Sequence, residues 1–257
     1  MKYAKNLGDK MDISYYNYLA EDYNHKRQKP WKALQHFLEY VQIDNLDSPD
    51  FCLDIGCGNG RNFPLISSFS NHIIGLDNSI ELLKLAQKNI ERQLTTPHMN
   101  NIDIQLILCS IGSIPIRPKT IGGVFMIAVI HHIKGKAKRR YIMKQIYEIV
   151  SDKGWLIVSL WRKYQKKYKW YFIKDLMKRF FLPEYKKKQI ESGLSEFGDK
   201  NVPWILSKEN KIISRFYHFF SRKEAKQLMN DFKTLEIVKL GGPGKADNFF
   251  FLLKKMN

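Results

Sequence analysis

The sequence predicts an α/β fold in which a mostly parallel sheet carries helices on both faces and ends in an antiparallel hairpin. Short apolar segments alternate with helical ones between residues 51 and 160, as buried parallel strands alternate with the helices that connect them. A glycine-rich turn at residues 56–60 follows the first apolar segment, and a Gly-Gly-Pro-Gly turn at 241–244 separates the last two. The first turn joins a strand to a helix, and the second joins two antiparallel strands.

Each expected element has its own signal. Five strands are predicted from apolar runs, at Phe51–Ile55, His72–Leu76, Ile102–Leu108, Gly123–Val129 and Trp155–Leu160. Helices are predicted before and between them, at Trp31–Val41, Asn62–Phe69, Ser79–Arg92 and Lys136–Val150. Pro30 stands just before the first of these helices as a start signal. The terminal hairpin is predicted at Leu235–Leu240 and Asn248–Leu253.

One domain over residues 1–257 is the expected organisation, because there is no internal repeat and no long linker. It divides into a helical N-terminal segment (1–49), a core (50–161), an insert (162–220) and a terminal helix with the hairpin (221–257). The insert interrupts the strand–helix alternation and is expected to be helical, basic and on the substrate side.

The charge is strongly basic and unevenly distributed. The chain has 43 Lys and Arg against 25 Asp and Glu, a net charge of +18. Residues 162–188 hold 11 of the basic residues, only two acids, and eight aromatic rings. An AT-rich genome would also raise the lysine content, but it would spread the charge more evenly. The local excess favours a nucleic acid as partner.

Several classes of protein are excluded or disfavoured by composition. A hydrophobic content of 44% rules out a disordered chain, and no apolar run approaches the roughly 20 residues of a membrane span. The first residues contain no apolar stretch of the signal-peptide type. Three cysteines, Cys52, Cys57 and Cys109, form no Cys-x-x-Cys pair. We expect a protein of the cytoplasm, with the nucleus as a further location, that binds no metal and does not attach to a membrane.

The turn at 56–60 is the strongest local motif. Glycines at 56, 58 and 60 allow the backbone to turn sharply and to approach a ligand closely. This spacing is tighter than the dinucleotide pattern Gly-x-Gly-x-x-Gly. Asp77 ends the second strand, where a carboxylate can accept hydrogen bonds from both hydroxyls of a ribose.

From Phe51 to Leu160 the pattern resembles the class I S-adenosylmethionine-dependent methyltransferases, which have a Rossmann-like, seven-stranded sheet. The resemblance implies S-adenosylmethionine as cofactor. It implies that Asp54 supports the turn and the methionine amino group, and that Gly56 and Gly58 lie against the cofactor. Asp77 would bind the ribose. Ser110 stands where the family commonly has an Asp that binds the adenine, and Ala128 completes the implied cofactor site.

The end of the fourth strand carries His131 and His132, at the sheet edge where α/β enzymes bind ligands. Adjacent strand residues face opposite ways, so joint metal binding by this pair is not expected.

Further fragments are Arg27 before Pro30-Trp31, Gly198-Asp199-Lys200-Asn201-Val202-Pro203-Trp204, Arg215-Phe216-Tyr217-His218, and Asn248-Phe249. With Ala128 to His132 they resemble the tRNA methyltransferases that esterify 5-carboxymethyluridine at the wobble position, and the methyltransferase domain of the AlkB-homologue tRNA hydroxylase. Phe249 departs from the family's usual Trp.

This second resemblance implies roles for eight residues. The catalytic set would be Arg27, His131, Arg215 and His218, with the arginines recognising a carboxylate and the histidines orienting it. The substrate-binding set would be Asp199, Trp204, Tyr217 and Asn248. For Trp204 and Tyr217, stacking on a flipped base and packing in the core are equally open. Implied partners are tRNA and a small zinc-binding activator subunit.

Two other functions stay open on the sequence alone. A methyltransferase for a small molecule would share the glycine turn but would not explain the basic, aromatic insert. A non-catalytic subunit that kept the fold would show an eroded cofactor turn, and only Ser110 points that way.

Overall fold

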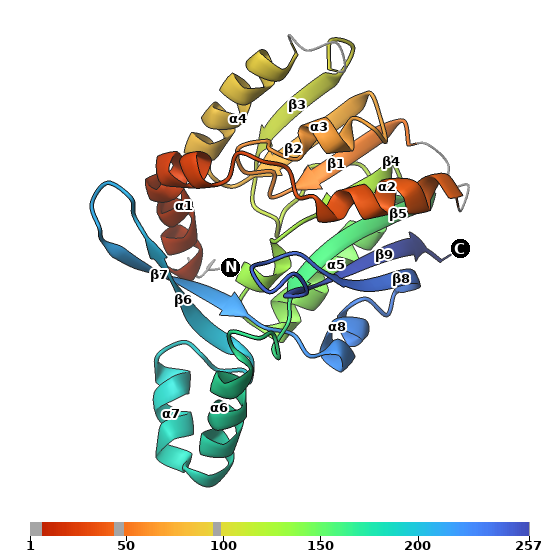
Figure 1. Cartoon of the computed structure of the whole chain (residues 1–257). Helices are drawn as coiled ribbons and strands as arrows, with labels where there is room; N and C mark the ends of the chain where they lie inside the picture. The colour runs from red at the N-terminus through yellow and green to blue at the C-terminus, as the bar shows by residue number, and fades with distance from the viewer. Residues whose placement is uncertain (1–6, 44–48, 95–98, 257) are drawn as a thin grey trace, which may run out of the picture.

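The computed structural model describes residues 7–43, 49–94 and 99–256. Its centre is a seven-stranded sheet in the order β3-β2-β1-β4-β5-β9-β8 (Figure 1). The strands are β1 (Phe51–Ile55), β2 (His72–Asp77), β3 (Asp103–Leu108), β4 (Ile121–Met126), β5 (Val150–Trp161), β8 (Phe232–Leu240) and β9 (Asn248–Lys255). β1 to β5 are parallel, and β9 lies antiparallel between β5 and β8. The fold class predicted from the sequence is therefore confirmed.

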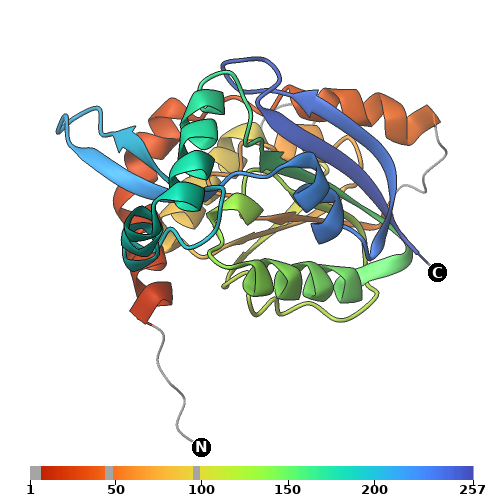
Figure 2. The same ribbon diagram turned by 90° about the horizontal axis from the view of Figure 1, so that it is seen from below.

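Alternate residues of the strands feed two cores, one on each face of the sheet. Figure 2 shows that helices cover both faces. Cys52 belongs to the core under α2 (Ala33–Ile43), α3 (Phe63–Ile66) and α4 (Ile80–Gln93). Leu53 belongs to the core under α5 (Lys136–Ile149) and α8 (Arg222–Leu228). Both residues are fully buried, as expected for strands covered on both faces.

Local signals in the sequence start the helices that flank the sheet. Ser79 caps α4 by accepting a hydrogen bond from the Leu82 amide at 3.2 Å. Ser221 and Glu224 form a reciprocal capping box at the start of α8. The long N-terminal helix α1 (Leu7–Lys26) packs against α4 and lies next to the insert (Figure 1). No helix in the described stretches of the chain is both long enough and apolar enough to span a bilayer.

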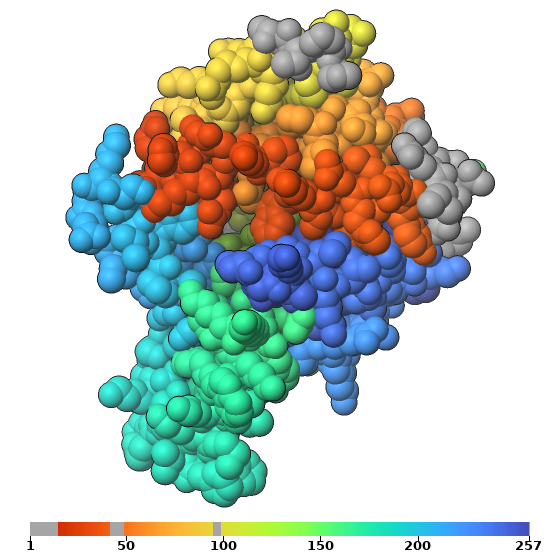
Figure 3. Space-filling view, viewed as in Figure 1, coloured from red at the N-terminus to blue at the C-terminus, as the bar shows by residue number. Residues whose placement is uncertain are grey.

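The insert holds more than the helices that were predicted for it. After α6 (Lys169–Phe181) and α7 (Pro183–Glu191) comes a two-stranded antiparallel ribbon of β6 (Asp199–Ile205) and β7 (Ile212–His218). The two helices form an arm that projects from the body of the molecule (Figures 1 and 3). The ribbon lies instead against α1, at one side of the sheet's ligand-binding edge (Figure 1).

The fourth strand ends earlier than the predicted Gly123–Val129. Ala128 has a positive φ of 62°, a backbone conformation that a strand cannot contain. The Ala128 amide donates to the Ser159 hydroxyl of β5 at 2.8 Å, which holds this turn in place. A single 3-10 turn, Ile130–His132, follows. The two histidines are therefore on a tight turn, and the prediction that they face opposite ways is wrong.

Candidate functional site

A cavity of about 1520 Å³ lies beyond the carboxyl ends of β1, β2 and β4. Its walls come from the glycine turn, the segment after α1, the Ala128 turn, the β6–β7 ribbon and the β8–β9 loop. Figure 3 shows it as a hollow between the N-terminal segment and the ribbon. The volume exceeds the roughly 300–1,000 Å³ of most small-ligand pockets, so a cofactor and an acceptor fit in it together.

The glycine turn forms one wall of this cavity. Gly56, Gly58 and Gly60 all have positive φ, and a Cβ at Gly56 would collide with Val129. The Gly56 and Cys57 amides donate to the Leu76 carbonyl at 2.7 and 2.9 Å, which fixes the turn against β2. Gly56 and Gly58 line the cavity, as the resemblance implies.

Asp77 also lines the cavity, at the end of β2. Its two carboxylate oxygens accept hydrogen bonds from the Gly58 and Ser79 amides at 2.8 and 2.9 Å. Burial raises the pKa of Asp77, although these backbone donors oppose the shift. The carboxylate is thus held rigidly beside the glycine turn, with lone pairs left for a ligand's hydroxyls.

Asp54 lies within β1 and is only 1% exposed. Its Oδ2 has no hydrogen-bond partner among the residues that the structure describes. Burial and the nearby Asp77 raise the pKa of Asp54 to about 8. Asp54 does not itself line the cavity, although Ile55 and Gly56, which follow it, do. A buried carboxyl without a partner is costly, and its place just before the glycine turn fits the ammonium end of an amino-acid ligand.

Ser110 does not take the position that was predicted for it. It is exposed, it does not line the cavity, and its hydroxyl accepts a hydrogen bond from the Gly112 amide at 3.3 Å. Cys109 and Ile111 form the wall there. After β3, Cys109 and Ile111 face the cavity and Ser110 does not. An adenine bound there would meet a thiol and an aliphatic side chain.

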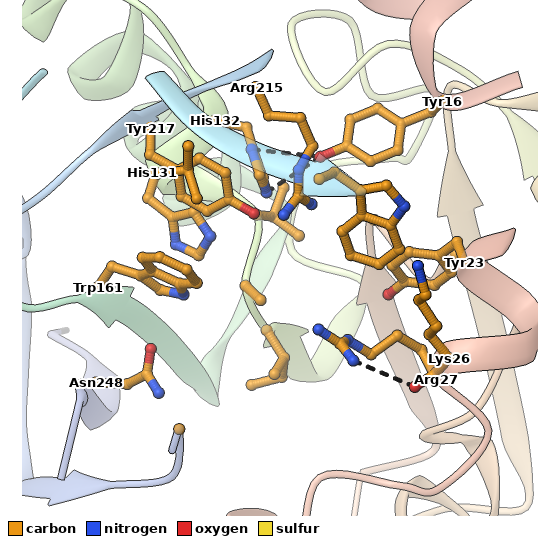
Figure 4. Close-up of a pocket in the computed structure, with 18 of the residues that line it drawn as sticks. Tyr16, Tyr23, Lys26, Arg27, His131, His132, Trp161, Arg215, Tyr217 and Asn248 are labelled. Carbon is orange, nitrogen blue, oxygen red and sulfur yellow. Dashed lines mark hydrogen bonds between the residues drawn. The ribbon is translucent and has the colours of Figure 1, made fainter. Parts of the chain in front are cut away.

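A group of four packed rings closes the inner end of the cavity (Figure 4). His131 lies parallel to Tyr217, with ring centroids 5.1 Å apart, and Trp161 lies 4.4 Å from Tyr217. The His132 ring centroid is 4.6 Å from that of His131. Tyr217 is 3% exposed and is part of this wall of packed rings, so its faces are not free to stack on a base.

Both histidines are neutral imidazoles. Burial lowers the pKa of His131 well below its usual value, and His132 and Arg215 add to the effect. Burial and Arg215 lower the pKa of His132 to about 3. His132 donates from Nδ1 to the Phe216 carbonyl at 3.3 Å and accepts at Nε2 from Tyr16 at 3.2 Å. Neither ring nitrogen of His131 has a partner among the described residues.

Three arginines line the cavity, and none forms an ion pair with a described acidic residue. Arg27 and Arg215 extend into it from opposite sides (Figure 4). The Arg215 guanidinium carbon lies 4.4 Å from the Trp204 ring centroid and 5.1 Å from that of Tyr217. The third, Arg61, was not predicted, although its place directly after Gly60 was a usable signal.

His218 and Asp199 are not at the cavity, which corrects their predicted roles. The buried His218 ring donates from Nδ1 to Asp199 at 2.7 Å and from Nε2 to Glu224 at 3.0 Å. Burial would raise the pKa of Glu224, but His218 and Lys163 lower it to about 2. This cluster joins the ribbon to α8. Neither the histidine nor the aspartate is free to bind a substrate.

Trp204 and Asn248 both line the cavity, in different ways. Trp204 is 6% exposed, stacks on Tyr23 at 6.2 Å and donates from Nε1 to Asp22 at 2.6 Å, so the core alternative holds for this ring. Asn248 starts β9 and donates from Nδ2 to the Leu240 carbonyl at 3.3 Å. Its side chain is visible at the edge of the cavity in Figure 4.

A family model described as a methyltransferase domain matches residues 53–158, from β1 with its glycine turn to β5. Residues 53–158 form an S-adenosylmethionine-dependent methyltransferase domain. The orphaned Asp54, the glycine turn and the held Asp77 carboxylate fit that cofactor. The methyltransferase domain thus confirms the predicted cofactor class.

Two curated relatives of this methyltransferase have a named substrate. The mouse tRNA (carboxymethyluridine(34)-5-O)-methyltransferase ALKBH8 is 26% identical over 165 residues, which are 64% of this chain and 22% of that protein. The enzyme of the same description from Arabidopsis thaliana is 25% identical over 151 residues, 59% of this chain and 32% of its own. The chain therefore spans about a fifth to a third of the length of these relatives.

The methyltransferase also resembles a solved structure. An S-adenosylmethionine-dependent methyltransferase from Methanosarcina mazei superposes with a TM-score of 0.62 at 17% identity. The match covers 84% of this chain and 98% of that one, so the fold extends well beyond residues 53–158.

Proposed function

We propose that the methyltransferase acts on a carboxylate, and that its acceptor is 5-carboxymethyluridine at the wobble position of tRNA. The observation that carries the proposal is the Arg215 guanidinium. It lies in the cavity next to His131 and Tyr217 without an ion-pair partner among the described acids. An unpaired guanidinium in a partly buried site favours an anionic ligand, and its planar fork suits a carboxylate.

The chemistry needs positioning more than acid–base catalysis. When bound, the cofactor supplies a methyl group on a sulfonium sulfur. An acceptor carboxylate is already ionised at neutral pH, so no residue has to remove a proton. The new bond joins a carboxylate oxygen to the methyl carbon as the carbon–sulfur bond breaks. The protein must hold that oxygen in line, about 3 Å from the methyl carbon, and must exclude water.

The residues at the inner end of the cavity suit this task. Arg215 can hold one side of the carboxylate, while the neutral His131 has a free N–H to orient the other side. A neutral imidazole donates a hydrogen bond without adding a second charge that would make the oxygen less nucleophilic. The rings of Trp161 and Tyr217 exclude water around it. Arg27, the second candidate for this role, projects from the opposite wall.

The choice of tRNA as substrate is supported by the named relatives and by charge. Lys166 and Lys167, near the start of the insert, are exposed and line the cavity. A net charge of +18 attracts a polyanion over a distance, and cations that line the cavity suit the phosphates that flank a flipped-out nucleotide.

The test uses tRNA that carries 5-carboxymethyluridine, incubated with methyl-labelled S-adenosylmethionine, followed by mass spectrometry of the nucleosides. The expected product is a labelled ester, which mild alkali hydrolyses. Arg215→Gln should abolish the label, while Arg140→Gln, an exposed arginine of α5, should not. A matched tRNA with the carboxamide in place of the acid should stay unlabelled.

Other outcomes identify the alternatives. Label that resists alkali would show a different acceptor atom and refute carboxylate methylation. Unlabelled tRNA together with normal cofactor binding would favour a small-molecule acceptor. The absence of any thermal stabilisation by S-adenosylhomocysteine would favour the non-catalytic alternative.

A further inference from the structure

Arg61 and Arg27 line the cavity on the side of the glycine turn. The Arg27 guanidinium carbon lies 5.3 Å from the ring centroid of Trp204, the ring that Arg215 also faces. Arg61 directly follows the glycine turn, and its guanidinium carbon lies 5.4 Å from the Trp31 ring centroid and 5.9 Å from that of Tyr23. Arg27 comes directly after α1, and its Nη1 donates to the Lys26 carbonyl at 3.2 Å. Neither arginine forms an ion pair with an acid in the described ranges.

Two asparagines, one in the glycine turn and one just after it, hold the backbone of this site. Asn59 donates from Nδ2 to the Arg27 carbonyl at 3.0 Å, and Asn62 accepts at Oδ1 from the Trp31 amide at 3.1 Å. Both asparagines are buried. The backbone that carries Arg27 and Trp31 is therefore tied to the glycine turn and to the residues that follow it.

Holding two like charges together without an anion is unfavourable. Partial burial of the Arg27 guanidinium lowers its pKa, and the positive charges of Arg61 and Arg215 lower it further. A bound anion would relieve this repulsion. The position of Arg27 and Arg61 indicates which anion this is. The Tyr23 ring approaches to 3.5 Å from where a Cβ of Gly58 would stand, so the site belongs to the cofactor half of the cavity. S-adenosylmethionine carries a single anionic group, the carboxylate of its amino-acid moiety.

We propose that Arg61, together with Arg27, binds the carboxylate of the cofactor's methionine moiety. Arg215 is then left for the acceptor, and only this role of Arg215 rests on the proposed function. The methionine moiety would then face two protein groups of opposite charge. Arg61 would face its carboxylate, and Asp54, which interacts electrostatically with Arg61, would face its ammonium group. The assignment also moves Arg27 from the acceptor to the cofactor.

The test compares two ligands by calorimetry in the absence of RNA. S-adenosylhomocysteine has the carboxylate, whereas 5′-methylthioadenosine lacks the whole amino-acid moiety. In Arg61→Gln the dissociation constant for S-adenosylhomocysteine should rise at least about tenfold, as expected for one lost charge-assisted hydrogen bond. The constant for methylthioadenosine should stay within about twofold, because the adenosine contacts are untouched. Arg27→Gln should act in the same direction.

Matched variants separate the assignment from simpler effects. Arg61→Lys should restore some of the affinity, since it keeps the charge but not the fork. Arg215→Gln should leave the binding of both ligands unchanged. The proposal is overturned if Arg61→Gln weakens both ligands equally, which would indicate a distorted turn, or if it weakens neither. Loss of tRNA binding with normal S-adenosylhomocysteine binding would also overturn it and assign the pair to a phosphate. Because no RNA enters the calorimetry, failure here leaves the tRNA labelling result unaffected.

Discussion

Cofactor binding is predicted to release a proton from Asp54. This carboxyl is buried and, among the described residues, without a partner at Oδ2, and its pKa of about 8 leaves it mostly protonated at neutral pH. If the cofactor's ammonium group returns the pKa of Asp54 to its ordinary range of about 4, the acid ionises on binding. Affinity should then rise with pH up to about 8 and level off above it, because protonation of the free protein competes with the ligand.

The size of the effect follows from that shift. A pKa of about 8 in the free protein predicts the release of about 0.9 proton per ligand at pH 7 and a rise in affinity of about 25-fold between about pH 6 and pH 7.5. The pKa values of both cavity histidines, His131 and His132, are lowered below this window, so neither supplies the proton.

Calorimetry of S-adenosylhomocysteine in phosphate and in Tris measures the released proton, because the two buffers differ in their heat of protonation. Asp54→Asn should bind more weakly and lose most of the pH dependence, while Asp77 stays in place in both proteins. Without ligand, the stability of the fold depends on pH in the opposite direction from the affinity. A carboxyl with a raised pKa destabilises the fold as pH rises from about 4 to about 8, so Asp54→Asn should melt at a higher temperature than the parent at pH 8. Equal slopes in parent and variant would refute the reasoning.

Four other expectations follow from the same structure. Asp77→Ala should lose most of its affinity for the cofactor, since each charged hydrogen bond to a ribose hydroxyl is worth roughly 1.5–3 kcal/mol, and Asp77→Glu should keep some of it; unchanged calorimetry in the alanine variant would exclude the ribose contact. His218→Ala should destabilise the fold by about 3–5 kcal/mol in urea titrations, because the buried Asp199 and the partly buried Glu224 lose the charged donor that they share, and a loss below about 1 kcal/mol would show that the cluster is dispensable. Binding of tRNA should depend steeply on salt, with a slope that flattens when three lysines near the arm are changed to Gln but not when three lysines of α8 and β8 are. The first three are Lys166, Lys167 and Lys169, and the control set is Lys223, Lys226 and Lys233. The implied zinc-binding activator stays a prediction: Phe180 and Phe181 are 77% and 62% exposed, so changing both to Ser should weaken a reconstituted complex, whereas an isolated chain that is monomeric and fully active would refute the need for a partner.

The cofactor half of the site could be predicted because its chemistry lies in short local patterns. Gly56 and Gly58 follow β1 within a few residues, Asp77 ends β2, and the strands themselves are plain apolar runs. Ser110 shows the limit of this reasoning. A shift of one residue along the loop after β3 decides which side chains face the cavity. How that loop packs sets the shift, and the local sequence does not reveal it.

The acceptor half could not be predicted to the same depth, because residues distant in the sequence build it. The β6–β7 ribbon was missed because it lacks a long apolar run and contains Pro203, which is tolerated only because a two-stranded ribbon consists of edge strands. His218 follows Tyr217 directly, yet strand alternation turns one to the rings and the other to Glu224. The contact that decides the role of His218 is a pairing across the ribbon, with Asp199.

β9 lies inside the sheet although it is the last strand in the chain. Phe250 and Leu252 complete the core on one face, and Phe251 and Leu253 complete the core on the other. A ribosome-bound chain that has not yet released these residues leaves β5 as a bare edge, with both apolar layers open. We expect such nascent chains to need protection from edge-to-edge association. The glycine turn is synthesised early, but the sheet that supports it closes only after β9 has left the ribosome.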